Sequence, residues 1–165
     1  MNARYPSILV FVFSLVVSNL SFAGSIWSAD YQGEKWHDNF SAAKKTAAAQ
    51  SKPVLVYFSG SDWCRSCAEL DQNTLVMDGF QKLAKQSLVL MNADFPSESA
   101  QSANIGQQND RLREQYGVLG FPTMVLVNPS TGEKITKFSG CSFFSCKEDR
   151  VLKKLAKALK KFSDS

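Results

Sequence analysis

Two cysteines separated by two residues, Cys64 and Cys67, stand between an apolar run and a segment with helical spacing. The run at residues 54–58 is β-branched and aromatic, which is typical of a buried strand. The connection at 59–62 is short and contains a glycine, and helical spacing begins near Cys64 and continues to residue 70. A buried strand that turns at once into a helix is a unit of α/β domains, so this feature constrains the fold class.

The rest of the chain supplies the other elements of such a domain. We expect helices over residues 36–50, 80–86, 109–116 and 147–162, and strands over 88–93, 123–127 and 133–139. Residues 95–108 are rich in Ser, Gln and Asn without apolar periodicity, so a loop is expected there. A turn-forming segment at 128–132 makes the last two strands antiparallel neighbours. The predicted fold is a single α/β domain with a central mixed sheet flanked by helices.

The first 23 residues have the three-part pattern of a secretory signal peptide. Arg4 supplies a positive charge, residues 8–20 are almost wholly apolar, and small residues stand at 21 and 23, where a signal peptidase reads the chain. The apolar stretch is short against the roughly 20 residues that span a bilayer. We therefore expect a cleaved signal peptide over 1–23, a mature domain over 24–165, and a periplasmic location.

The charge of the chain argues against nucleic acid as a partner. Its formal net charge is +4 at pH 7, whereas a nucleic-acid site usually needs a dense basic patch. The lysines of the last predicted helix lie mostly away from its apolar positions, so we expect a solvated face, with a membrane surface as the alternative. His37 is the single histidine. It is expected at the surface, because a Cys–His pair would need it beside Cys64.

The spacing of Cys64 and Cys67 suits thiol–disulfide chemistry. In the first turn of a helix, the first cysteine meets unpaired N–H groups and the positive end of the helix dipole, which stabilise a thiolate. We therefore predict Cys64 as the attacking thiol and the more buried Cys67 as the resolving thiol. Arg65 adds a positive charge that favours the Cys64 thiolate. The alternative is half of a zinc site, which Cys141 and Cys146 would have to complete.

The strand at 54–58, the motif Trp63-Cys64-Arg65-Ser66-Cys67 and the later Gly120-Phe121-Pro122-Thr123 together resemble the thioredoxin superfamily. Residues 59–62 and 88–94 are similar to those of periplasmic reductases of the DsbH and DsbD type. The resemblance implies a thioredoxin fold with a cis peptide bond before Pro122, facing the dithiol. It assigns Trp63, Phe121, Pro122 and Thr123 to substrate binding, and it implies no cofactor and no metal.

The direction of electron flow stays open between three functions. The favoured one is a reductase of exported protein disulfides, kept reduced by a membrane electron donor of the DsbD type. Large oxidases of this superfamily carry an inserted helical domain for which residues 68–121 have no room, and isomerases add a dimerisation domain, so a monomer is expected. Arg65 argues for an oxidase, since a stabilised thiolate makes a better oxidant. A metal-holding protein or metallochaperone is the third function.

Two features depart from the family pattern. Tyr57 occupies the strand position where cytoplasmic thioredoxins carry a buried acid that assists proton transfer from the resolving thiol, and a tyrosine is a poor base at neutral pH. Asp62, Glu69 or water is expected to replace that acid. Arg65 and Ser66 stand where Gly-Pro is usual, so the strongly reducing potential of thioredoxin is not implied.

A second cysteine pair, Cys141 and Cys146, lies between the last predicted strand and the last predicted helix. The expected role is a structural disulfide that fixes the start of the helix. A second redox pair and two unpaired thiols are the alternatives. Phe143 and Phe144 are expected to form an apolar lip at the substrate groove, with burial in the core as the alternative.

Overall fold

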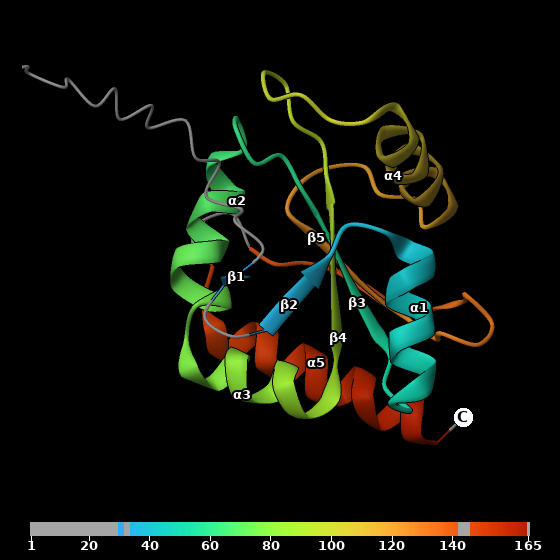
Figure 1. Ribbon diagram of the computed structural model, residues 1–165. Coiled ribbons are helices and arrows are strands. Elements are labelled where there is room, and N and C mark those ends of the chain that lie inside the picture. Colours follow the sequence, from blue (N-terminus) through green and yellow to red (C-terminus); the bar gives the residue numbers. More distant parts are fainter. Residues whose placement is uncertain (1–29, 32–33, 142–145, 165) are drawn as a thin grey trace, which may run out of the picture.

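The structure, a computed structural model, describes residues 30–31, 34–141 and 146–164 (Figure 1). Its centre is a six-stranded mixed sheet with the strand order β1-β2-β4-β3-β5-β6. The strands are β1 (Asp30–Tyr31), β2 (Glu34–His37), β3 (Val54–Ser59), β4 (Val89–Asp94), β5 (Thr123–Val127) and β6 (Lys134–Ser139). The helices are α1 (Phe40–Ala49), α2 (Arg65–Leu70), α3 (Asp78–Ser87), α4 (Ala103–Gln115) and α5 (Glu148–Ser163), and a π-helical turn, η1 (Asp71–Leu75), follows α2 directly.

Strand β3 lies inside the sheet between β4 and β5, and all six of its residues are buried. It pairs in parallel with β4 and antiparallel with β5, so that Leu55 lies between Leu90 and Leu126. A parallel pair needs a crossover connection, which α2, η1 and α3 provide between β3 and β4. The two cysteines of the Cys64–Cys67 motif therefore lie at the carboxyl end of β3, where ligands of open α/β sheets bind.

Helices cover both faces of the sheet (Figure 1). On one face, Ala43 of α1 and Leu112 of α4 belong to the same buried cluster as Val56. On the other, α2, α3 and α5 contribute to a cluster that contains Leu155 and Tyr57. Burial of each large apolar side chain contributes roughly 1.5–3 kcal/mol, so the two clusters hold β3 in place from both sides.

The predicted helix over 36–50 is wrong in its first residues. Trp36 and His37 belong to β2, where they pair with Leu90 and Met91 of β4. Helix α1 begins at Phe40, because the Asn39 side chain accepts a hydrogen bond from Ala42 N and caps the helix. The alanine-rich part of the segment is helical as predicted, whereas strand pairing, a tertiary effect, decides the residues before it.

The predicted loop over 95–108 is also wrong in its second half. Helix α4 begins at Ala103, six residues before the predicted start. The sequence of α4 is polar, so it lacks the apolar periodicity by which a helix is predicted. One of its buried residues is Asn109, which is fully buried and donates a hydrogen bond to Asp94 O at 2.9 Å. A buried asparagine with a backbone partner takes a position where the apolar pattern requires a hydrophobic residue.

The other predicted elements are confirmed with small changes of their ends. The break expected between the motif helix and residue 80 is η1, and α3 begins at Asp78. Strands β5 and β6 form the predicted antiparallel hairpin. Helix α5 buries Val151, Leu155 and Ala158. Within the described ranges, no helix is both long enough and apolar enough to cross a membrane.

The predicted signal peptide over residues 1–23 lies outside the described residues. The same holds for Phe143 and Phe144, so the predicted apolar lip stays a prediction.

Candidate active site

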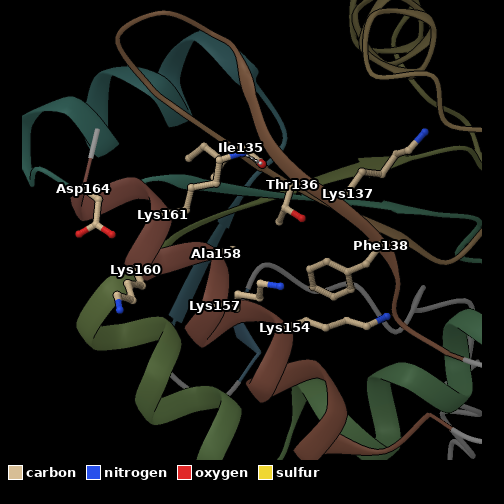
Figure 2. A pocket seen from close by; sticks show the side chains of 10 residues that line it. All are labelled: Ile135, Thr136, Lys137, Phe138, Lys154, Lys157, Ala158, Lys160, Lys161 and Asp164. Atoms are coloured by element: carbon tan, nitrogen blue, oxygen red, sulfur yellow. Dashed lines mark hydrogen bonds between the residues drawn. The ribbon is translucent and has the colours of Figure 1, made fainter.

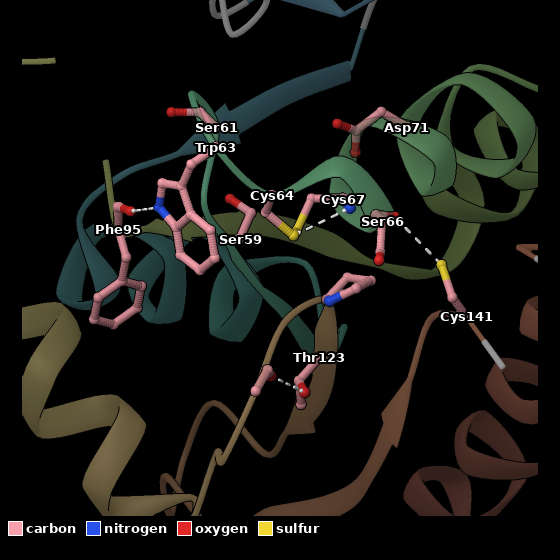
Figure 3. Close-up of a disulfide and its surroundings, with 12 residues drawn as sticks. Ser59, Ser61, Trp63, Cys64, Ser66, Cys67, Asp71, Phe95, Thr123 and Cys141 are labelled. Atoms are coloured by element: carbon pink, nitrogen blue, oxygen red, sulfur yellow. Dashed lines mark hydrogen bonds between the residues drawn. A yellow bond between two sulfur atoms is a disulfide. The ribbon is translucent and has the colours of Figure 1, made fainter. Parts of the chain in front are cut away.

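The Cys64–Cys67 pair forms a disulfide at the start of α2, with the two Cα atoms 5.2 Å apart (Figure 3). Cys64 is the N-cap residue of this helix, and Cys67 N donates a hydrogen bond to Cys64 Sγ at 3.2 Å. An N–H group aimed at this sulfur stabilises negative charge on it after reduction. Cys64 is partly exposed whereas Cys67 is buried. The first sulfur is thus the one that another molecule reaches.

The turn before the motif is tied to the end of β4 by Asp94. Its carboxylate accepts hydrogen bonds from Ser59 Oγ at 3.1 Å, Ser61 N at 2.9 Å and Ser61 Oγ at 2.6 Å. The indole of Trp63 packs directly on Gly60, where a Cβ atom would overlap the ring. Only glycine therefore fits at residue 60 without displacing Trp63.

Asp62, one of the proton acceptors that the sequence allowed, is held by three backbone donors. Its carboxylate accepts hydrogen bonds from Ser97 N, Glu98 N and Ser99 N, each at 2.8 Å. These backbone donors lower the pKa of Asp62 to about 2. A carboxylate that is so weakly basic anchors the loop after β4 instead of collecting a proton.

Arg65 and Glu69 form an exposed ion pair on α2. Arg65 Nε lies 3.5 Å from Glu69 Oε1, and the Arg65 side chain is 94% exposed. Solvent screens charges at such a position, so the influence of Arg65 on Cys64 is weak. Glu69 is exposed and paired with Arg65, so it differs from the buried acid that cytoplasmic thioredoxins carry near the resolving thiol.

Asp71, which sequence reasoning missed, is a buried acid shortly after the motif. Asp71 is 7% exposed, and the Tyr57 hydroxyl donates a hydrogen bond to its Oδ1 at 3.1 Å. It is four residues after Cys67, so both side chains lie on the same side of the helical segment. Desolvation by burial raises the pKa of Asp71 to about 7; the Tyr57 hydrogen bond opposes this shift, and the nearby charge of Asp94 adds to it.

Tyr57 carries no carboxyl on the central strand, but its hydroxyl binds the buried carboxyl of Asp71. A buried carboxyl whose pKa lies near neutrality exchanges a proton readily under physiological conditions. The four-residue spacing from Cys67 was the signal in the sequence that could have identified Asp71, because it places the two residues one helical turn apart.

An aromatic surface lies beside the motif. The Phe121–Pro122 bond is cis, as the resemblance implied. The Phe121 ring stacks on Phe95 with centroids 5.0 Å apart and meets the Trp63 indole edge-on at 5.8 Å. The indole Nε1 donates to Phe95 O at 2.8 Å, and the Arg113 guanidinium lies 5.7 Å from the centroids of both phenylalanine rings. These contacts hold the 55% exposed Trp63 over the start of α2.

A shallow groove of about 370 Å³ runs past the cis peptide bond. It is lined by residues of two neighbouring segments, 117–123 and 137–139, and includes Phe121, Pro122 and Thr123. The Thr123 hydroxyl donates to Gly120 O at 2.7 Å, which fixes the turn before β5. Leu119, at 93% exposure, projects from the rim of this groove. Three of the four predicted substrate-binding residues thus line one groove, and the fourth, Trp63, packs against Phe121.

The second cysteine pair is also bonded. Cys141 and Cys146 form a disulfide. Cys141 Sγ lies 3.4 Å from Ser66 O, inside the Cys64–Cys67 motif (Figure 3). Cys146 Sγ lies 3.7 Å from the same oxygen. The two pairs, far apart in sequence, therefore flank the same turn of α2.

The single histidine is separate from the dithiol. His37 lies on β2 opposite Met91 and lines a small pocket with Lys52 and Leu88. Partial burial and the charge of Lys35 lower the pKa of His37, and Asp38 opposes the shift. Among the described residues, no group of three or more His, Cys, Asp and Glu side chains has the arrangement of a metal site.

A basic groove of about 910 Å³ lies between β6 and α5, away from the dithiol (Figure 2). Five lysines surround it, namely Lys137, Lys154, Lys157, Lys160 and Lys161. Lys154 Nζ lies 5.1 Å from the centroid of the Phe138 ring. The side chains are spread around an open groove, which agrees with the predicted solvated face of the last helix.

Comparisons with known proteins agree with this geometry. The sequence model of a family described as thioredoxin-like matches residues 35–129. The disulfide bond reductase DsbH of Chlamydia pneumoniae is 31% identical over 110 residues, which cover 67% of this chain and 64% of that protein. The thiol:disulfide interchange protein DsbD of Actinobacillus pleuropneumoniae serotype 5b (strain L20) is 33% identical over 95 residues, which cover 57% of this chain and 14% of that protein.

The matched region thus spans less than two thirds of the length of either relative. A solved structure of a DsbH oxidoreductase has a TM-score of 0.68 and 28% identity, with 77% of this chain and 85% of that chain covered. The predicted thioredoxin fold is confirmed by these likenesses.

Proposed function

The chain belongs to the thioredoxin-like family, and on that premise we propose that it is an exported thiol–disulfide oxidoreductase that reduces protein disulfides through Cys64 and Cys67. The observation that carries the proposal is the Cys67 N–H group aimed at Cys64 Sγ, at 3.2 Å. This donor stabilises a thiolate on the partly exposed sulfur and leaves the buried sulfur to act second.

In the proposed reaction, the Cys64 thiolate attacks a substrate disulfide and releases one substrate thiolate. Cys67 then loses its proton and attacks Cys64 Sγ, which releases the second substrate thiol and forms the Cys64–Cys67 disulfide. The substrate gains two electrons and two protons, and the protein is oxidised. A membrane electron donor of the DsbD type would reduce the pair again.

Asp71 is the proposed proton acceptor for Cys67. A carboxyl with a pKa of about 7 is available in its ionised form near neutral pH and returns the proton easily. Tyr57 orients this carboxyl through its hydroxyl. The Tyr57–Asp71 pair thereby replaces the strand carboxylate of cytoplasmic thioredoxins, for which Asp62 and Glu69 are unsuited by their own hydrogen bonds and ion pair.

The groove at Phe121, Pro122 and Thr123 is the proposed substrate site, with an extended substrate segment lying against the Phe121 backbone. Trp63 and the exposed Leu119 offer apolar contacts on either side of it. The substrates would be exported proteins with disulfides, and the protein would act as a monomer in the periplasm after removal of residues 1–23. Amino-terminal sequencing of the secreted protein tests the last point, with Gly24 as the expected first residue.

Reduction is the proposed direction because DsbH, one of the relatives, is a disulfide bond reductase by name. The segment between α2 and the cis peptide bond supports it, since its described elements are η1, α3, β4 and α4 and include no further helical domain. An insulin-reduction assay, run beside the equilibrium of Cys64 and Cys67 with glutathione, tests this direction. We expect reduction that Cys64→Ser abolishes; an oxidising potential without insulin reduction would instead identify an oxidase.

A further inference from the structure

Gly140, Cys141 and Cys146 pack along one side of the active-site helix. Ser66, Leu70 and Thr74 follow one another at four-residue intervals, so they form a single stripe on α2 and η1. The Cys141–Cys146 sulfurs lie against Ser66 O, and the Gly140 backbone packs on Leu70, where a Cβ atom would overlap the leucine side chain. The Thr74 hydroxyl donates to Cys146 O at 3.2 Å.

Both sulfurs of this disulfide lie beside the same backbone oxygen, Ser66 O, at 3.4 Å and 3.7 Å. A disulfide has no S–H group, whereas each thiol of the reduced pair is a weak hydrogen-bond donor. Ser66 O is therefore an acceptor beside the pair that only the reduced form can use.

The two sulfurs also differ in accessibility, in the same way as the Cys64–Cys67 pair. Cys141 is partly exposed, and Cys146 is 6% exposed. A thiol from another molecule can attack the outer sulfur, and the inner one is then the leaving group and later the resolving thiol.

Contacts other than the disulfide hold the described residues on both sides of it. The bond joins residues five positions apart, so it closes a short loop and restricts the unfolded chain less than a long one would. Contacts on both sides remain when it opens: Gly140 against Leu70 before it, and Glu148 after it, whose Oε1 accepts a hydrogen bond from Phe80 N at 2.8 Å. Both cysteines therefore stay close enough to pair again.

We propose that Cys141 and Cys146 form a second thiol–disulfide exchange site, which takes electrons from an external dithiol through Cys141. A thiolate of the donor attacks Cys141 Sγ, the Cys141–Cys146 bond breaks, and Cys146 leaves as a thiolate that takes up a proton. The second thiol of the donor then attacks the mixed disulfide. The donor leaves as a disulfide, and two electrons and two protons have passed to the cysteine pair.

The test uses a full-length Cys64→Ser/Cys67→Ser variant, in which the proposed function is absent and cannot affect the result. This variant is equilibrated with graded ratios of reduced and oxidised dithiothreitol, quenched with acid, alkylated and weighed by mass spectrometry. We expect a reversible transition between no alkylated thiol and two, with an unchanged near-UV circular dichroism spectrum throughout. Reduction that occurs only together with loss of that spectrum would overturn the proposal.

A second measurement separates an exchange site from a disulfide that merely opens. In the same background, Cys146→Ser leaves Cys141 alone, and Cys141→Ser leaves Cys146 alone. With oxidised glutathione, we expect a mixed disulfide on Cys141 at least about tenfold faster than on Cys146, because the outer sulfur is the accessible one. Equal rates, or faster reaction of Cys146, would contradict the assigned roles.

Discussion

The Tyr57 hydroxyl donates a hydrogen bond to Asp71 Oδ1 at 3.1 Å, inside the core and one helical turn from the resolving cysteine. The contact joins the central strand to η1, and it places a titratable carboxyl where the strand itself has none. Because burial raises the pKa of this carboxyl to about 7, its charge changes near neutral pH. Three of the following predictions depend on this pair.

Replacing the carboxyl should slow the second half of the reaction. We expect Asp71→Asn to lower the rate of Cys67 attack on a mixed disulfide at Cys64 by about tenfold or more, since a positioned base is lost. In the wild type this rate should rise with pH around a midpoint near 7, and the variant should lack that step. Stopped-flow release of thionitrobenzoate from Cys64 measures it. The matched control is Glu69→Gln, which removes an exposed acid on the adjoining helix α2 and should retain the midpoint.

The same substitution should stabilise the oxidised protein at high pH. The pKa of the Asp71 carboxyl is near the ordinary aspartate value of 3.8 in the unfolded chain and about 7 in the folded one. Between these values the folded state holds more protons, so wild-type stability falls as the pH rises through this window. Asp71→Asn should therefore raise the free energy of unfolding by up to about 4 kcal/mol at pH values well above 7, and change it little below about pH 4. Urea unfolding across this range measures the difference, and a gain that does not depend on pH would contradict the buried, neutral carboxyl.

Removing the Tyr57 hydroxyl should raise the pH midpoint of the Cys67 step. The Tyr57 hydrogen bond lowers the pKa of Asp71. Tyr57→Phe should therefore move the midpoint of the Cys67 step to higher pH, and it should cost about 1–3 kcal/mol because a buried acceptor loses its donor. The pH profile and urea unfolding of Tyr57→Phe check both effects; an unchanged midpoint would show that the hydroxyl does not act on Asp71.

Glycine at residue 60 should be required for the position of Trp63. The added methyl group of Gly60→Ala overlaps the indole, so we expect the ring to move, its hydrogen bond to Phe95 O to break, and stability to fall by about 1–3 kcal/mol. In Gly60→Ala, the NMR resonance of the Trp63 indole N–H should shift, and the rate of insulin reduction should fall several-fold. Gly106→Ala in α4 is the control, because its added Cβ would meet Gln101 Oε1 at 3.4 Å, an ordinary contact distance. This substitution should raise the free energy of unfolding by about 0.5–1 kcal/mol. An unmoved Trp63 resonance in Gly60→Ala would contradict the close packing.

The elements that could be predicted from the sequence are those with a strong local pattern. Residues 54–58 are an unbroken apolar run, and β3 follows this run closely. The polar helix α4 could not be found in this way, because its buried Asn109 is satisfied by Asp94 O, a residue on another element. Trp36 and His37 were assigned to a helix for the same kind of reason, since their partners Leu90 and Met91 lie more than fifty residues further along the chain.

The amino-acid sequence by itself determined the dithiol and its place between a buried strand and a helix. These are local properties, set by side chains within a few positions of one another. The cis bond before Pro122 was expected from the resemblance to the thioredoxin superfamily and not from the local sequence. Only the tertiary structure decided which carboxyl after the motif is buried and what lies beside Ser66. Asp71 acquires its raised pKa from the core that surrounds it, and the Cys141–Cys146 pair meets the motif because β6 and α5 bring it back to α2. Burial and long-range packing have no signature in a short stretch of sequence, because they arise when distant segments exclude water from the same place.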